Sequence, residues 1–319
     1  MAQASFFVGP SLLPKQMPGQ PHCMRQQHVK LFSAVVVCCG PLWWRLGAQW
    51  ALSIPTPLPN AARGGTIACY GDSHTEGIYG GSWVPTLATQ LDCRCTNFGV
   101  NGESAIAVAR RARAAPTTER AVVLAGTNDA LMELAAVFGN EAMLEFYRRR
   151  NGLPASHLPS SESFAEHFQQ LLQAVPAKHL FVLSIPPLGE SLEGAAADTI
   201  REYNARIRQI VDDCPGAEYV PLYEELAPRL SMGRGEAFDA SRNGFQTSIS
   251  EMFTHTAMAR LPIGNSFDSL AESRGRSVLH DLIHLRESSA AVVADVLVDA
   301  MRPSCDDRPT RLSGVQRKK

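Results

Sequence analysis

The chain has 319 residues, and its 30 Lys and Arg residues almost balance its 31 Asp and Glu residues, which gives a net charge of −1. This balance excludes the basic surface that a nucleic-acid-binding protein needs. Hydrophobic residues make up 45% of the chain and charged residues 19%, a composition that excludes intrinsic disorder. Eight cysteines in this length also exclude a small disulfide-stapled scaffold. The length suits one α/β domain of about 200–250 residues with extensions.

The first 60 residues have the composition of an extension. No Asp or Glu precedes Asp72, and an apolar run of 14 residues, 31–44, ends at Arg45. The run is shorter than the about 20 residues of a membrane-spanning helix and is typical of the hydrophobic part of a signal peptide. We therefore expect a signal or anchor segment over 24–54 with a Pro-rich linker at 54–60, and we favour a secretory or membrane-anchored location. A mitochondrial transit peptide and an ordinary extension, as in a cytoplasmic protein, are the alternatives.

From residue 65 onward, short apolar runs alternate with amphipathic stretches. The predicted strands are 66–70, 94–98, 121–125, 179–185 and 218–222. The predicted helices are 83–91, 104–114, 163–175, 199–213 and 287–301. Continuous apolar strands are typical of a parallel sheet that is buried on both faces. The alternation predicts a three-layer α/β/α sandwich with a central, mainly parallel five-stranded sheet.

Two segments do not fit this alternation. Residues 138–161 contain an Arg triplet and two prolines, and residues 231–277 are rich in Gly, Ser and Met with weak periodicity. For the second we expect a solvated, mobile insertion, with a cap over the substrate site as the alternative. The predicted organisation is thus an N-terminal extension over 1–60, one folded domain over 61–302 and a polar basic tail over 303–319.

The first predicted strand runs into the sequence GDSHTEG at 71–77. A serine at a strand-to-helix turn projects its hydroxyl from the sheet edge, where helix N–H groups favour negative charge. Ser73 therefore has the position of a nucleophile, although serine is also a common helix cap. The neighbouring His74 is expected to point away from such a site.

Polar and glycine-rich turns also follow the second and third predicted strands. Gly102 lies in the turn 99–104, and its backbone N–H is unobstructed by a side chain and is expected to face the Ser73 hydroxyl. Asn128 follows the third strand, and its amide is placed to donate a hydrogen bond to an oxyanion. Turn formation by Gly102 and helix capping by Asn128 are the structural alternatives.

A candidate base precedes the last predicted helix, in the sequence Asp281-Leu282-Ile283-His284. A serine hydroxyl is a poor nucleophile until a base takes its proton, and a carboxylate is needed to orient that base. A spacing of three residues allows the Asp281 and His284 side chains to meet on one side of a turn. His280 is the competing base, and an ordinary surface pair is the structural alternative.

These four motifs, in this order, resemble those of the SGNH/GDSL hydrolase superfamily. The strings IACYGDSHTEG (67–77) and LAGTNDA (124–130) are most similar to those of its small esterases. The resemblance covers roughly residues 65–302 and implies a flavodoxin-like α/β/α sandwich. The family's nucleophile, two oxyanion-hole residues, acid and base fall on Ser73, Gly102, Asn128, Asp281 and His284. The chain departs from the family pattern at His74, where Leu or Ile is usual, and at Leu282 and Leu285, where Gly and Pro are usual.

The resemblance implies a serine hydrolase that cleaves carboxylic esters, of esterase or lipase type, through an acyl-enzyme intermediate. It implies a small-molecule or lipid acyl ester as substrate, with no metal, no organic cofactor and no nucleic acid. Membrane contact is expected only through the N-terminal apolar segment. An acyltransferase with the same triad and a catalytically silent binding module are the alternatives.

Overall fold

The computed structural model describes most of the predicted folded domain, namely residues 65–230, 235–261 and 264–302. The expected N-terminal extension with its segment 24–54, and the tail 303–319, lie outside the described residues. Among the helices that are described, none is long and apolar enough to cross a membrane.

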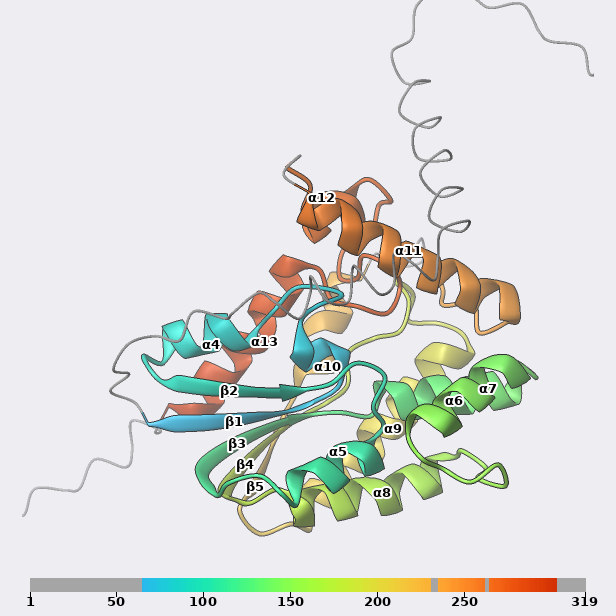
Figure 1. The fold of residues 1–319 in the computed structure, drawn as a ribbon. Coiled ribbons are helices and arrows are strands. Elements are labelled where there is room, and N and C mark those ends of the chain that lie inside the picture. The colour runs from blue at the N-terminus through green and yellow to red at the C-terminus, as the bar shows by residue number, and fades with distance from the viewer. Residues whose placement is uncertain (1–64, 231–234, 262–263, 303–319) are drawn as a thin grey trace, which may run out of the picture. The chain divides into compact units, whose positions relative to one another are not determined.

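A single five-stranded sheet forms the centre of the described domain, with the strand order β2-β1-β3-β4-β5 (Figure 1). All four strand pairings are parallel. The strands are β1 (Thr66–Gly71), β2 (Arg94–Gly99), β3 (Thr118–Leu124), β4 (Ala177–Leu183) and β5 (Ala217–Val220). The five predicted strands and the parallel sheet are confirmed. In this topology the residues that follow β1, β2 and β3 meet at one edge of the sheet.

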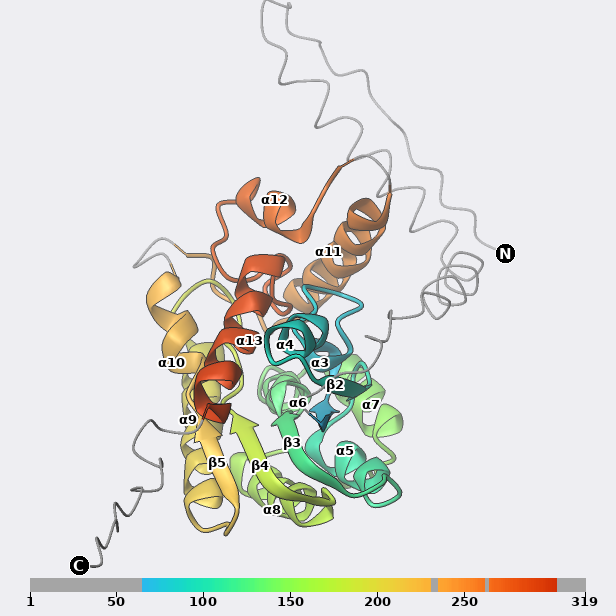
Figure 2. The ribbon, with the colours of Figure 1, turned by 90° about the vertical axis from the view of Figure 1, so that its left-hand side faces the viewer.

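Helices cover both faces of the sheet, as Figures 1 and 2 show. One face carries α5 (Ala105–Ala112), α6 (Thr127–Val137), α8 (Ser161–Ala174) and α9 (Ala195–Asp212). The other face carries α4 (Val84–Gln90), α10 (Leu222–Leu226) and α13 (Glu287–Met301). The other helices of the described residues are α3 (Ser73–Glu76), α7 (Glu141–Arg150), α11 (Arg242–Arg260) and α12 (Phe267–Glu272), with a 3₁₀ turn at Ala227–Arg229.

The strand side chains alternate between two hydrophobic cores. Ala68 and Tyr70 of β1 belong to the core under α5 and α8, whereas Ile67 and Cys69 belong to the core under α4 and α13. All four side chains are at most 1% exposed. Because both of its faces are buried, β1 has a continuous apolar run rather than an alternating pattern.

Both segments that do not fit the alternation contain helices. The expectation of a solvated insertion is wrong for α11 and α12, and the earlier irregular segment contains α7. The buried face of α11 includes the polar residues Ser248, Glu251 and His255 beside Phe245 and Met252. A helix that buries polar side chains shows no apolar stripe in its sequence, so hydropathy could not reveal it.

Candidate active site

Ser73 is the first residue of α3 and lies where β1 ends, at the carboxyl edge of the sheet. A Cβ at Gly71 would lie 2.2 Å from a β3 carbonyl oxygen, and one at Gly99 would lie 2.1 Å from a backbone nitrogen of α3. Glycine at both positions therefore lets α3 pack directly against the strand ends. Asp72 caps the helix, because its carboxylate accepts a 3.0 Å hydrogen bond from the backbone N–H of His74.

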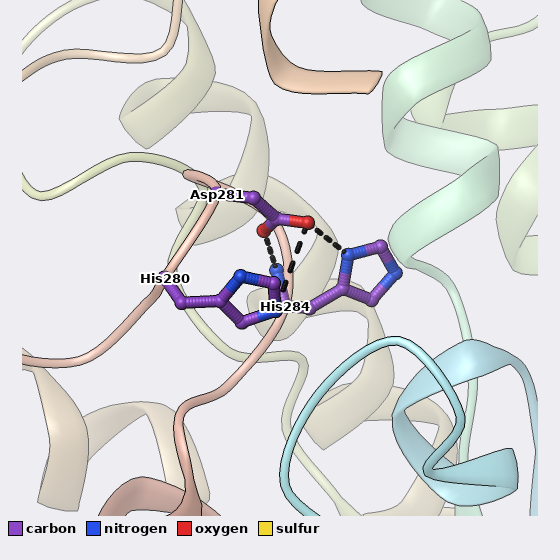
Figure 3. Close-up of side chains that lie close together, drawn as sticks. All are labelled: His280, Asp281 and His284. Carbon is purple, nitrogen blue, oxygen red and sulfur yellow. Dashed lines mark hydrogen bonds and ion pairs between the residues drawn. The ribbon is translucent and has the colours of Figure 1, made fainter. Parts of the chain in front are cut away.

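Ser73, His284 and Asp281 form one continuous chain of contacts. His284 Nε2 lies 3.0 Å from Ser73 Oγ, and His284 Nδ1 lies 2.7 Å from Asp281 Oδ2. The other Asp281 oxygen accepts the backbone N–H groups of Ile283 and His284, at 3.0 and 2.6 Å. Figure 3 shows this carboxylate beside the His284 ring. In this turn Leu282 has a left-handed backbone conformation (φ +71°), so it carries local backbone strain. The SGNH/GDSL hydrolases that the sequence resembles usually have glycine at this position.

The electrostatics of this chain favour an ionised aspartate beside a basic histidine. Burial alone would raise the pKa of Asp281, but the His284 and His280 rings and the hydrogen bonds from His284 hold it well below its usual range. Burial lowers the pKa of His284, but the charge and hydrogen bond of Asp281, together with the charges of Asp72 and Glu76, raise it by more in total, so that it lies above its ordinary value. His284 is therefore a stronger base than an isolated histidine.

His280, the competing base, is directed elsewhere. Its Nε2 lies 2.6 Å from the carbonyl oxygen of Tyr79, and its Nδ1 lies 3.1 Å from Nδ1 of His255. Both ring nitrogens are thus occupied by partners other than Ser73. The structure brings His284, and not His280, to the serine hydroxyl.

His74 does not point away from the site, so that expectation is wrong. Its side chain is buried, and its ring centroid lies 5.6 Å from that of His284. Neither ring nitrogen has a hydrogen-bond partner among the described residues. Burial and the neighbouring His284 lower the pKa of His74 to about 3, so the ring is neutral at physiological pH.

Asn128 lies in the first turn of α6 and links two of the sheet-edge loops. Its Nδ2 donates a 2.9 Å hydrogen bond to the carbonyl of Glu103, next to Gly102, and makes a longer 3.4 Å contact with the Asp72 carboxylate. Gly102 has φ +76°, a conformation that favours glycine. The structure therefore gathers the Gly102 loop, Asn128 and the Ser73 turn at one edge of the sheet.

The end of α7 holds the Gly102 loop in place, which the sequence analysis missed. The buried Asn151 accepts the N–H of Ser104 at 2.7 Å and donates to the carbonyl of Gly102 at 3.2 Å. The Arg150 guanidinium donates to the carbonyl of Asn101 at 2.6 Å. The Arg triplet was visible in the sequence, but nothing local indicated that its helix reaches this loop.

A second missed group fixes the loop that carries Asp281 and His284. The buried Glu190 accepts the backbone N–H groups of residues 277–279 at 2.6–2.9 Å. Arg276, also buried, donates to the carbonyl of His280 and pairs with Glu251 of α11, both at 2.7 Å. The loop before α13 is thus tied to Glu190 and to α11, which come from earlier parts of the chain.

The same loop holds a group with metal-ligating side chains. Within the described residues, one cluster of His, Cys, Asp or Glu could hold an ion, and it consists of His280, Asp281 and His284 (Figure 3). The His284 and Asp281 atoms already hydrogen-bond to each other, and His280 Nε2 already bonds to the Tyr79 carbonyl. Hydrogen bonds within the protein thus account for the ligand atoms of this group.

Comparisons with known proteins identify a family for this chain. The model of the GDSL-like Lipase/Acylhydrolase family matches residues 69–244. No curated protein matches the chain. Among solved structures, the acetyl xylan esterase AlAXEase has 14% identity and a TM-score of 0.47, over 74% of this chain and 100% of its own. LAE5, an alpha/beta hydrolase from the metagenome of Lake Arreo, Spain, has 14% identity and a TM-score of 0.47, over 75% of this chain and 96% of its own. Axe2, an acetylxylan esterase from Geobacillus stearothermophilus, has 13% identity and a TM-score of 0.47, over 76% of this chain and 95% of its own.

Proposed function

Because the chain belongs to the GDSL-like lipase/acylhydrolase family, we propose that it is an ester-cleaving hydrolase in which Ser73 is the nucleophile, His284 the general base and Asp281 the residue that orients the base. The observation that carries the proposal is the continuous contact from Asp281 through His284 to Ser73, at 2.7 and 3.0 Å. Both distances lie within hydrogen-bond reach, which a nucleophile and its base require.

In the first half of the reaction, Ser73 Oγ attacks the ester carbonyl carbon while His284 Nε2 takes the hydroxyl proton. The carbonyl electron pair moves onto the oxygen and forms a tetrahedral oxyanion. When this intermediate collapses, the bond to the alcohol oxygen breaks, and His284 gives its proton to the departing alcohol. The acyl group is then covalently bound to Ser73.

In the second half, His284 takes a proton from water as the water oxygen attacks the acyl carbon. Collapse of the second tetrahedral intermediate releases the carboxylic acid and returns the proton to Ser73 Oγ. Asp281 stays ionised throughout and stabilises the imidazolium form of His284, consistent with its depressed pKa.

The oxyanion is stabilised by the backbone N–H groups of Ser73 and Gly102 and by the side-chain amide of Asn128. Support comes from the position of all three at the carboxyl edge of the sheet. One proton of the Asn128 amide is held by the Glu103 carbonyl, whereas the other has only the longer contact with Asp72. That second proton is the one available to the oxyanion.

The test is hydrolysis of p-nitrophenyl esters, from acetate to palmitate, by the full chain and by its Ser73→Ala variant. Turnover that the variant loses, with an unchanged melting temperature, supports the proposal, and the preferred acyl length separates an esterase from a lipase. New esters formed with an added alcohol would instead favour an acyltransferase. The absence of turnover on every ester by a folded protein would favour a silent binding module.

A further inference from the structure

Two further histidines, His255 and His280, form a pair next to the Ser73–His284–Asp281 chain of contacts. His255 of α11 and His280 of the loop before α13 are both buried, at 4% and 0% exposure. Their Nδ1 atoms are 3.1 Å apart, within hydrogen-bond distance. The two residues come from separate segments, and the proposed mechanism uses neither of them.

The partners of His280 determine which nitrogen of each ring carries a proton. The carbonyl oxygen of Tyr79, 2.6 Å from His280 Nε2, can only accept a hydrogen bond, so Nε2 must donate. Burial lowers the pKa of His280, which keeps the ring neutral and leaves Nδ1 as an acceptor. The proton shared between the two Nδ1 atoms therefore belongs to His255.

The His280 ring is in turn placed against the proposed catalytic residues. Its Nε2 lies 3.8 Å from Asp281 Oδ2, and its ring packs against that of Phe267, with a centroid distance of 4.4 Å. The backbone N–H of His280 donates to the carbonyl of His284 at 3.1 Å. The orientation of His280 and the shape of the Asp281–His284 turn are thus physically linked (Figure 3).

We propose that His255 is a positioning residue for the triad: its Nδ1–H donates to His280 and, through that ring, holds Asp281 and His284 in line with Ser73. The inference rests on the proposed function, because it assigns a role within that reaction. The donor comes from α11, so a helix that lies outside the strand–helix alternation takes part in the geometry of the site.

Other contacts keep α11 in place when this one hydrogen bond is removed. Glu251 pairs with Arg276 at 2.7 Å, and Arg260 donates to the carbonyl of Ile78 at 3.1 Å. Phe253 packs edge-on against Tyr79, with a centroid distance of 5.9 Å. A substitution that removes only the Nδ1–H donor of His255 should therefore alter the site while α11 stays packed in place.

The experiment compares His255→Leu with His255→Asn. The leucine and asparagine side chains are similar in size, but only the asparagine amide places an N–H near the position of the histidine Nδ1. We expect His255→Leu to lose about 10- to 100-fold in kcat on the best p-nitrophenyl ester with little change in KM, since a small misplacement of catalytic groups has effects of that size. His255→Asn should restore kcat to within about threefold of the wild type. His179→Leu, which removes an exposed histidine of β4, is the matched control and should retain full activity.

Equal kcat values for His255→Leu and the wild type, or equal losses in His255→Leu and His255→Asn, would overturn the inference. Ser73→Ala, run beside them, separates the two proposals: if it keeps its activity, the proposed function itself fails. If His255→Leu does not fold, the nitrogen-15 spectrum of the wild-type histidines decides. A proton on His255 Nδ1 and on His280 Nε2 supports the inference, and a proton on His255 Nε2 alone contradicts it.

Discussion

His284 Nε2 lies 3.0 Å from Ser73 Oγ although 211 positions separate the two residues in the chain. The contact exists because β1 delivers Ser73 to the carboxyl edge of the sheet, while the loop before α13 folds back over the same edge. Glu190 and Arg276 hold that loop through its backbone.

The identity of the base is tested by comparing His284→Ala with His280→Ala. Because only His284 reaches Ser73, its loss should lower kcat by about 10⁴-fold or more. His280→Ala should lower kcat by about 10- to 100-fold, since it changes the position of the base and leaves its chemistry intact. Steady-state rates on one ester, with melting temperatures for both variants, measure this. The reverse order of damage would reassign the base.

The pH dependence of kcat/KM tests the pairing of His284 with Asp281. The base must be neutral to act, and its pKa is raised above 6.5 by the carboxylate. The wild-type profile should therefore fall as the pH drops through a value above 6.5. In Asp281→Asn this acid limb should move to lower pH, and kcat should fall by about 10⁴-fold. An acid limb that stays in place would show that another group controls it.

Replacement of Asn128 by leucine tests the oxyanion hole. The loss of the amide donor should lower kcat by about 10²- to 10³-fold with little effect on KM. Asn204→Leu is a suitable control, because Asn204 is also buried and, among the described residues, its side chain bonds only to the backbone of Ile185. The control should lower the melting temperature and spare kcat of the folded enzyme. Equal kcat losses in both variants would contradict a catalytic role for Asn128.

Asp129 should make the protein less stable as the pH rises. Burial raises its pKa to about 7, against an ordinary value of 3.8, although the N–H of Ala105 partly offsets this. Between these pH values the folded state holds a proton that the unfolded state has lost, so the free energy of unfolding falls by about 1.4 kcal/mol per pH unit. Asp129→Asn keeps an acceptor for Ala105 and should flatten this slope. Urea unfolding at several pH values measures it, and an unchanged slope contradicts the assignment.

The parallel sheet and the four motifs could be read from the sequence because each depends on local signals. Apolar runs identify β1 and β3 as buried strands, and Ser73 and Asn128 lie in the turns that follow them. Gly102 lies in the glycine-rich turn after β2. The spacing of Asp281 and His284 is likewise local.

The supporting residues could not be predicted, because their contacts join segments that are far apart in the chain. Glu190 caps backbone groups 87–89 positions away, and Asn151 reaches Ser104 across 47 positions. His255 lies on a helix whose buried face is partly polar, so no apolar periodicity marks it. His74 was placed wrongly because the sequence does not indicate that the His284 ring packs beside it.

Covalent labelling is the most direct test that Ser73 is the nucleophile. The full chain would be treated with a fluorophosphonate, which reacts with activated serine hydroxyls, and the labelled peptide would be located by mass spectrometry. We expect one adduct on Ser73 that is lost in His284→Ala, together with the loss of ester turnover. An adduct on a different residue, or full ester turnover by a protein whose Ser73 is labelled, would contradict this expectation.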